Sequence, residues 1–350
     1  MSRHVVVLGG DGIGPEVTNA AVEVLRALDA RLPLGLSFEA QPFGGAAIDA
    51  HGDPLPEHVL AACRKADAIL LGAVGGPQWA KVPTEIRPEA GLLRLRSELG
   101  LYANLRPLQV HQALVDASPL KRERIEGVDL IVVRELTGGI YFGQRTRSDV
   151  RATDECAYTV AEVERVARTA ATLARRRRGK LTSVDKANVL ETSRLWREVV
   201  TRIVRDEFPD VTLDHLLVDA MAMYLVSRPR DFDVIVTENL FGDVLTDECA
   251  AVSGSLGLMP SASVGDDGPG VYEPIHGSAP DIAGRGVANP YGTILSAAMM
   301  LRQSLHADAA ATALEAAVQQ AIADRVWTRD LGGSATTAEA AAAVTARLGR

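Results

Sequence analysis

Short runs of β-branched and aliphatic residues alternate with longer, alanine-rich amphipathic stretches along most of this 350-residue chain. The first such run covers residues 5–8, a stretch of helical periodicity follows at 15–30, and another apolar run lies at 36–40. Strands that alternate with helices are typical of βα units, in which successive strands are parallel. The sequence therefore predicts an α/β fold with a large sheet.

The same alternation continues to the end of the chain. Further strands are predicted at 68–71, 130–133, 181–184, 213–218 and 232–236, and further helices at 57–66, 160–178, 192–208, 293–305 and 309–326. Between them, Gly72 to Pro88 form a loop long enough to be functional, and Thr137-Gly138-Gly139 predict a turn followed by an extended segment at 140–142.

Length and composition exclude several classes of protein. A chain of 350 residues exceeds the size at which single cores stop growing, so we expect two lobes. A net charge of -8 argues against bulk attraction to nucleic acid or to anionic membranes. Three widely spaced cysteines predict neither disulfides nor a zinc site. Because no apolar run approaches 18 residues and no signal peptide is evident, we expect a cytoplasmic protein.

Acidic residues follow two of the predicted strands. If a helix begins at Gly242, Asp243 and Asp247 lie one turn apart on the same face, and Asp219 follows the strand at 213–218. An acidic pair at this spacing is by itself most often a solvated helix face. Carboxylate oxygens are nevertheless the ligands that Mg²⁺ and Mn²⁺ prefer. The three aspartates therefore form a candidate metal site.

Glycines at positions 10, 12 and 14 follow the first strand and open the first helix. Their spacing is G-x-G-x-G, whereas the dinucleotide-binding fingerprint is G-x-G-x-x-G with an acidic partner about 20 residues later. We therefore interpret them as a tight βα turn that lets other groups approach closely. The chain also has no Walker sequence, which argues against phosphoryl transfer.

The segment Arg134-Glu135-Leu136-Thr137-Gly138-Gly139-Ile140-Tyr141-Phe142-Gly143 resembles a known family. Other resembling segments occur in the same order at 10–17, 91–96, 104–107, 183–189, 218–223, 239–247 and 276–284. Together they resemble the 3-isopropylmalate dehydrogenases of the β-decarboxylating dehydrogenase superfamily. The resemblance implies the two-lobed isocitrate/isopropylmalate dehydrogenase-like fold with a large mixed sheet, not an ordinary Rossmann fold. It also implies a nucleotide-binding lobe from residues 1–101 and 255–350, and a central lobe, 102–254, with the dimer interface and most substrate and metal ligands.

This resemblance implies an activity: NAD-dependent oxidative decarboxylation of (2R,3S)-3-isopropylmalate to 4-methyl-2-oxopentanoate, in leucine biosynthesis. Lys186 would help remove the proton of the C2 hydroxyl, and Tyr141 would protonate the enol carbon or relay a proton to it. Mg²⁺ or Mn²⁺, held by Asp219, Asp243 and Asp247, would assist the reaction. The resemblance also implies a homodimer in which Lys186 and Asp219 serve the partner's site.

Substrate and cofactor residues follow from the same resemblance. The implied substrate-binding residues are Leu92, Leu93, Arg96, Arg106, Arg134, Asn188, Val189 and Asp219, with the two leucines forming an apolar slot for the isopropyl group. The implied cofactor-binding residues are Gly76, Glu89, His276, Gly277, Ser278, Ala279, Pro280, Asp281, Ile282, Ala288 and Asn289. Asp281 could accept hydrogen bonds from ribose hydroxyls and repel a 2′-phosphate, which favours NAD over NADP.

Two alternatives stay open. A D-malate, tartrate or homoisocitrate dehydrogenase of the same superfamily would differ chiefly at Leu92, Leu93 and the loop before them. A regulatory subunit without activity is disfavoured, because Lys186, Tyr141 and the three aspartates are all present.

Overall fold

The computed structural model describes residues 2–349 and divides the chain into two compact units. The end unit consists of Met1–Gly100, His111–Ala117 and Gly254–Arg350, and the central unit of Leu101–Val110 and Ser118–Ser253. This division differs from the expected lobes chiefly at 111–117, which belong to the end unit.

The end unit contains five strands. Their order is β2 (Leu36–Gln41), β1 (Arg3–Gly10), β3 (Ala68–Ala73), β12 (Gly270–Pro274) and β11 (Pro260–Val264). Neighbouring strands are parallel except β11 and β12, which are antiparallel. Every residue of β3 is buried, as expected for a parallel strand covered on both faces.

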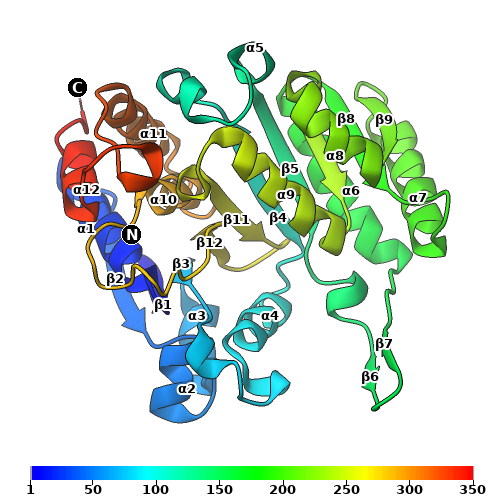
Figure 1. Cartoon of the computed structure of the whole chain (residues 1–350), viewed down its shortest axis with the longest axis horizontal. Coiled ribbons are helices and arrows are strands. Elements are labelled where there is room, and N and C mark those ends of the chain that lie inside the picture. The colour runs from blue at the N-terminus through cyan, green and yellow to red at the C-terminus, as the bar shows by residue number, and fades with distance from the viewer. Residues whose placement is uncertain (1, 350) are drawn as a thin grey trace. The chain divides into compact units, whose positions relative to one another are not determined.

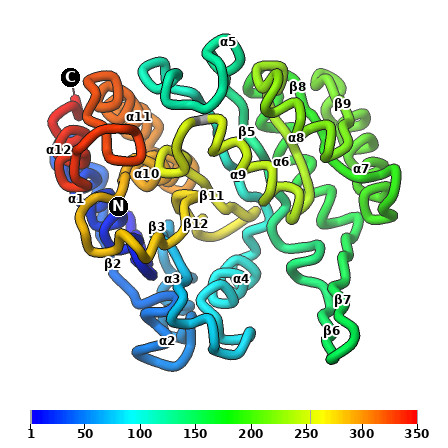
Figure 2. The backbone as a smooth tube through the Cα atoms, in the orientation of Figure 1, coloured from blue at the N-terminus to red at the C-terminus, as the bar shows by residue number. Residues whose placement is uncertain are grey.

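Helices from both ends of the chain belong to this unit. They are α1 (Gly14–Arg31), α2 (Gly45–His51), α3 (Glu57–Lys65), α4 (Pro88–Glu98), α10 (Tyr291–Gln303), α11 (Asp308–Ala323) and α12 (Thr337–Thr345). Helix α1 begins with proline in its first turn, where a missing N–H costs nothing, and it buries Val17, Val24 and Leu28 at helical spacing. Helix α12 packs against α1, so the first and last segments of the chain lie side by side (Figures 1 and 2).

The central unit has its own five strands. Their order is β4 (Ala103–Gln109), β5 (Asp129–Glu135), β10 (Val234–Thr237), β8 (Lys180–Asp185) and β9 (Thr212–Leu217). Only β4 and β5 are antiparallel; the other neighbours are parallel. The register sets Thr237 opposite both Arg134 and Val184. The carboxyl ends of β5, β8 and β10 therefore meet at one edge, where ligands of parallel sheets usually bind.

The helices of the central unit are α5 (Arg122–Ile125), α6 (Val160–Arg176), α7 (Glu191–Glu207), α8 (Val218–Ser227) and α9 (Asn239–Ser253). A two-stranded hairpin, β6 (Arg145–Arg147) and β7 (Ala152–Asp154), extends from this unit (Figure 1). Helix α6 starts with a capping box, in which Thr159 and Glu162 satisfy each other's backbone N–H groups. No helix among residues 2–349 is long and apolar enough to cross a membrane.

Two local predictions are wrong. Residues 139–141 form a 3₁₀ turn, not an extended segment, because Gly139 adopts a left-handed φ of 72° that bends the chain. Helix α9 begins at Asn239, three residues before Gly242, because the carboxylate of Glu238 accepts the backbone N–H of Phe241 at 2.6 Å.

The predicted close approach at the glycine turn is confirmed. A Cβ on Gly12 would lie 2.0 Å from the carbonyl oxygen of Ser278, and Gly12 has a positive φ of 57°. Any other residue at this position would therefore separate the start of α1 from the loop that contains Ser278.

Candidate active site

Arg134, Tyr141 and Asp243 form the centre of a charged cluster in the central unit. Arg134, at the end of β5, forms an ion pair with Asp243 on α9, and its side chain is only 3% exposed. The hydroxyl of Tyr141 donates to the other oxygen of Asp243 at 2.9 Å. The guanidinium of Arg134 also lies over the Tyr141 ring, 5.6 Å from its centroid. The structure thus brings Asp243 to Arg134 and Tyr141, which lie 109 and 102 positions earlier in the sequence.

Arg106 approaches the same carboxylate from β4. Its Nε donates to Oδ1 of Asn104 at 2.6 Å, and its Nη1 donates to Oγ1 of Thr246 at 2.5 Å. Its Nη2 lies 3.8 Å from Oδ1 of Asp243. Two forked guanidinium groups therefore converge on one region, and this geometry suits carboxylates that are bound by two hydrogen bonds each.

The protonation states in this cluster follow from its charges. Burial alone would raise the pKa of Asp243, but Arg134, Arg106 and the hydrogen bond from Tyr141 lower it. Burial and the neighbouring Asp243 raise the pKa of Tyr141. Desolvation and Asp243 likewise raise the pKa of Asp247, against the effect of Arg106. At neutral pH the cluster thus contains an ionised Asp243 beside a neutral phenol.

Lys186 follows β8 and lies with Asp219, which belongs to the first turn of α8. The Nζ of Lys186 donates to Oδ1 of Asp219, and this bond lowers the pKa of Asp219. Buried Asp185 fixes the adjoining turn: it accepts two hydrogen bonds from Arg197, each of 2.8 Å, and one from the N–H of Ala187 at 2.9 Å. The candidate substrate residues Asn188 and Val189 lie in this turn, and both are exposed.

The three candidate metal ligands are found in two places. Asp243 and Asp247 share a face of α9, one turn apart, whereas Asp219 is paired with Lys186. Within residues 2–349, no group of three or more His, Cys, Asp and Glu side chains is placed to hold a metal ion. The oxygen donors fit Mg²⁺ or Mn²⁺ by type, but a single chain does not bring all three together.

The predicted cofactor loop, 276–282, contacts the start of α1 in the end unit. The backbone N–H of Ile13 donates to the carbonyl oxygen of Ser278 at 2.8 Å. Ala279 and Ile282 pack against a buried cluster of Ile13, Val17 and Ala288. Ala279 has a positive φ of 38°, a conformation that costs energy for any residue but glycine. Tertiary contacts therefore hold the loop in a strained shape.

The segment that follows this loop, residues 286–288, is fixed by Glu16 of α1. Its carboxylate accepts the backbone N–H of Ala288 at 2.9 Å and that of Gly286 at 3.2 Å, and it also accepts the hydroxyl of Thr337. The next candidate, Asn289, is buried and donates to Asp330 at 2.9 Å. These contacts leave residues 286–289 with little freedom.

The remaining residues of the loop differ in exposure. Gly277, Pro280 and Asp281 are exposed, which leaves the carboxylate of Asp281 accessible to a ligand. The Nδ1 of His276 lies 2.9 Å from the carbonyl oxygen of Gly277, and burial lowers the pKa of this imidazole. His276 is therefore neutral at pH 7.

A hollow of about 330 Å³ in the end unit is lined by Gly76, Trp79, Ala80, Arg87, Pro88 and Glu89. It includes two of the predicted cofactor residues, Gly76 and Glu89. Small-molecule sites usually have volumes of about 300–1,000 Å³, so this hollow could accept part of a nucleotide.

Helix α4 contains three candidate substrate residues. Leu92 and Leu93 are half-buried and so offer apolar surface to a ligand. Arg96 is buried and donates from Nη2 to Oε1 of Glu273 at 2.8 Å. Its Nε is buried without a partner among the described residues. Because an unsatisfied buried donor costs free energy, this atom is suited to a carboxylate ligand.

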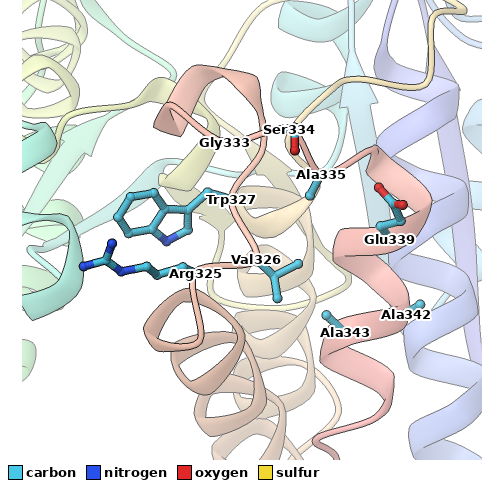
Figure 3. A pocket seen from close by; sticks show the side chains of 9 residues that line it. All are labelled: Arg325, Val326, Trp327, Gly333, Ser334, Ala335, Glu339, Ala342 and Ala343. Carbon is cyan, nitrogen blue, oxygen red and sulfur yellow. The ribbon is translucent and has the colours of Figure 1, made fainter.

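A second hollow, of about 570 Å³, lies where the turn after α11 meets α12 (Figure 3). Arg325 and Trp327 extend side by side from the turn, with the guanidinium 5.5 Å from a ring centroid. No predicted site residue lines this hollow, so we assign it no role in the reaction.

The sequence analysis gave no role to five residues that shape these sites: Glu16, Asn104, Asn239, Thr246 and Glu273. Four of them lie inside or beside the segments that resemble the family, which is the signal that could have identified them. Glu273 had no such signal, because its partner Arg96 lies 177 residues away.

Comparison with known proteins identifies the family. The family model described as isocitrate/isopropylmalate dehydrogenase matches residues 4–345. A protein named 3-isopropylmalate dehydrogenase from Anaeromyxobacter dehalogenans is 56% identical over 99% of this chain and 100% of its own length. Its namesake from Bacillus subtilis is 54% identical over 95% of this chain and 93% of its own length.

Solved structures agree with this result. The isocitrate dehydrogenase of Methylococcus capsulatus superposes with a TM-score of 0.89 at 36% identity, covering 99% of this chain and 100% of that one. A β-decarboxylating dehydrogenase from Thermococcus kodakarensis has a TM-score of 0.81 at 37% identity, with coverages of 99% and 96%.

These matches define an enzyme class, the decarboxylating dehydrogenases with this α/β fold. The chain belongs to the isocitrate/isopropylmalate dehydrogenase family and is an oxidoreductase. The predicted fold class and enzymatic character are confirmed, whereas the roles of individual site residues stay predictions.

Proposed function

We propose that the enzyme oxidises (2R,3S)-3-isopropylmalate with NAD⁺ to give 4-methyl-2-oxopentanoate, carbon dioxide and NADH, a step of leucine biosynthesis that takes place in the cytoplasm. One observation carries the choice of substrate: proteins named 3-isopropylmalate dehydrogenase are 52–56% identical to this chain over nearly its full length. The geometry of the central unit supports the type of reaction.

Arginines bind the two carboxylates of the substrate. Arg106 and Arg134 are buried, adjacent and charged, so they compensate the cost of removing a dianion from water. Arg96, with its unpartnered Nε, adds a third guanidinium. This local capture explains how a protein of net charge -8 binds an anion.

Lys186 and Tyr141 move the protons. As the hydride leaves C2, the hydroxyl on C2 loses its proton to Lys186. After the C3 carboxylate has left as carbon dioxide, Tyr141 delivers a proton to C3. The raised pKa of the phenol keeps this proton in place at neutral pH, and the hydrogen bond to Asp243 orients it.

Asp243 and Asp247 would hold Mg²⁺ or Mn²⁺, with Asp219 as a third ligand from the partner chain of a homodimer. When bound, the metal ion would act as a Lewis acid toward the substrate oxygens, and NAD would accept the hydride. The separation of Asp219 from the other two carboxylates within one chain supports this shared arrangement. Asp281, exposed on the cofactor loop, favours NAD over NADP.

Leu92 and Leu93 favour a substrate with a branched apolar group. D-malate, tartrate and isocitrate carry hydrogen, hydroxyl or a carboxymethyl group, respectively, in place of the isopropyl group, and they would leave these side chains without an apolar partner. One such contact contributes only about 1–3 kcal/mol of discrimination, so substrate choice requires direct measurement.

The test is NAD reduction in the presence of Mg²⁺, measured separately with 3-isopropylmalate, D-malate, tartrate, isocitrate and homoisocitrate. We expect kcat/KM for 3-isopropylmalate to exceed each of the others by about 10-fold or more, and a chelator to abolish activity. A higher kcat/KM for any of the other acids would identify that acid, and not 3-isopropylmalate, as the preferred substrate. Absence of turnover with all five would contradict the proposed function.

A further inference from the structure

We propose that Asn239 is a positioning residue for substrate binding: it holds the guanidinium of Arg134 in place through a neutral oxygen and so preserves its charge for a substrate carboxylate. The proposal rests on the proposed function, in which Arg134 binds 3-isopropylmalate. The proposed function states that Arg134 binds the substrate, whereas the present proposal states which residue orients Arg134.

The contact between the two side chains is buried and has two hydrogen bonds. Oδ1 of Asn239 accepts from Nε of Arg134 at 2.9 Å and from Nη2 at 2.7 Å. Asn239 has no exposed surface, and Arg134 is 3% exposed. One edge of the guanidinium is therefore fixed to the protein, and its remaining nitrogen, Nη1, is directed toward Asp243.

The amide of Asn239 is itself fixed. Its Nδ2 donates to the carbonyl oxygen of Gly138 at 3.1 Å, and its backbone N–H donates to the hydroxyl of Tyr158 at 3.0 Å. A flipped amide would place an NH₂ group against the donors of Arg134 and an oxygen against Gly138. Because three hydrogen bonds would be lost, only one orientation is compatible with the structure.

A neutral acceptor matters because of the charges nearby. An aspartate at position 239 would have the same shape and would bind the same edge of Arg134 as a carboxylate, which makes a stronger, charge-assisted pair. Asp243 already lies against Arg134, so a second carboxylate would give the arginine a net negative surrounding. The two carboxylates would then offset the charges of Arg134 and Arg106, so a dianionic substrate would be attracted less strongly.

Arg106 also donates to a buried asparagine, through one hydrogen bond, which supports the inference independently. Its Nε donates to Oδ1 of Asn104, another fully buried asparagine. In the register of β4 and β5, Asn104 lies opposite Arg134, so both arginines and both amides belong to one patch of the sheet. Each of the two arginines is thus oriented by an uncharged oxygen.

The first test is Asn239→Asp, with Asn19→Asp on the exposed face of α1 as a control for the added charge. We expect KM for 3-isopropylmalate to rise about 30-fold in Asn239→Asp, with kcat and the KM for NAD within about threefold of wild type, because lost ground-state binding raises KM alone. Calorimetric titration with 3-isopropylmalate and Mg²⁺, without NAD, should show the same weakening. Asn19→Asp should match wild type in both measurements.

The second test is a double-mutant cycle, which does not depend on the folding of the aspartate variant. Asn239→Ala should lower kcat/KM about 10-fold in the wild type, but less than twofold when Arg134 is already lysine, because Asn239 acts through the guanidinium. Equal losses in both backgrounds, or an Asn239→Asp variant with unchanged KM, would overturn the positioning role. Wild-type enzyme that does not turn over 3-isopropylmalate would instead refute the proposed function, so the two failures are distinguishable.

Discussion

The charged cluster of the central unit and the cofactor loop of the end unit are organised by different kinds of contact. In the cluster, the side chains of Arg106 and Arg134 both approach Asp243, and their charges lower the pKa of Asp243 against the effect of burial. In the cofactor loop, Ile13 holds the backbone through the C=O group of Ser278, and in the segment after the loop Glu16 holds it through the N–H group of Ala288.

This difference matches the two tasks that we propose. Proton transfer and anion binding need charges at defined positions, so a single changed side chain there should slow the reaction strongly. Cofactor recognition needs a loop of defined shape, and several contacts share in fixing it. We therefore expect variants in the cluster to have large effects on kcat and variants at the loop to have smaller effects on cofactor KM.

The largest effect is expected from the shared site. Lys186→Ala and Asp243→Asn homodimers should each lose about 10³-fold in kcat, because each removes a charged group at the reacting centre. If Lys186 serves the partner's site and Asp243 its own, each hybrid dimer contains one intact site. Random reassortment of equal amounts should then restore about a quarter of wild-type activity.

The experiment is to unfold and refold the two variants together and to measure NAD reduction. Each variant refolded alone is the control. If hybrids form but activity stays at the level of the separate variants, each site is built within one chain and Lys186 does not cross the interface.

Tyr141→Phe tests whether the cluster works through proton transfer. We expect kcat to fall about 100-fold, since general acid catalysis is lost, while the affinity for NAD stays nearly unchanged. Tyr224→Phe is a matched control, because it also removes a phenol but keeps the ring on which Arg228 lies. An unchanged kcat in Tyr141→Phe would assign Tyr141 to packing.

Asp281→Lys combined with Ile282→Tyr tests the cofactor loop through charge. Replacing a repelling carboxylate by a cation and adding a hydroxyl should shift the ratio of kcat/KM for NAD and NADP about 30-fold toward NADP, or about 2 kcal/mol. Asp267→Lys makes the same change of charge on an exposed loop of the end unit and should leave the ratio unaltered. A constant ratio in the double variant would show that the adenosine site lies elsewhere.

Glu16→Gln tests the backbone contacts and should have the smallest effect. The amide keeps one acceptor but loses charge-assisted bonds to Gly286 and Ala288, so we expect KM for NAD to rise about fivefold, or about 1 kcal/mol. KM for 3-isopropylmalate should not change. Glu23→Gln, on the exposed face of the same helix, is the control. A larger loss in kcat than in cofactor KM would contradict the proposed division of tasks.

Much of the architecture could be predicted from local patterns. The strands at 5–8, 68–71 and 181–184 and the helices at 160–178 and 192–208 occur close to their predicted limits, because their periodicity and burial agree. Strands β11 and β12 were not predicted, because their polar and proline-containing segments become strands only when they pair with each other and with β3.

The sequence by itself determined the alternation of strands and helices, which depends on local spacing, and the family, which its ordered motifs resemble. The same resemblance predicts Tyr141, Lys186 and the three aspartates as site residues. Only the tertiary structure decided which residues orient the side chains and backbone of these sites. Asn239 contacts Arg134, which lies 105 positions away in the sequence, and Glu16 contacts Ala288, which lies 272 positions away. Such pairs arise from strand register and helix packing, in which distant segments become neighbours, and no local pattern encodes them.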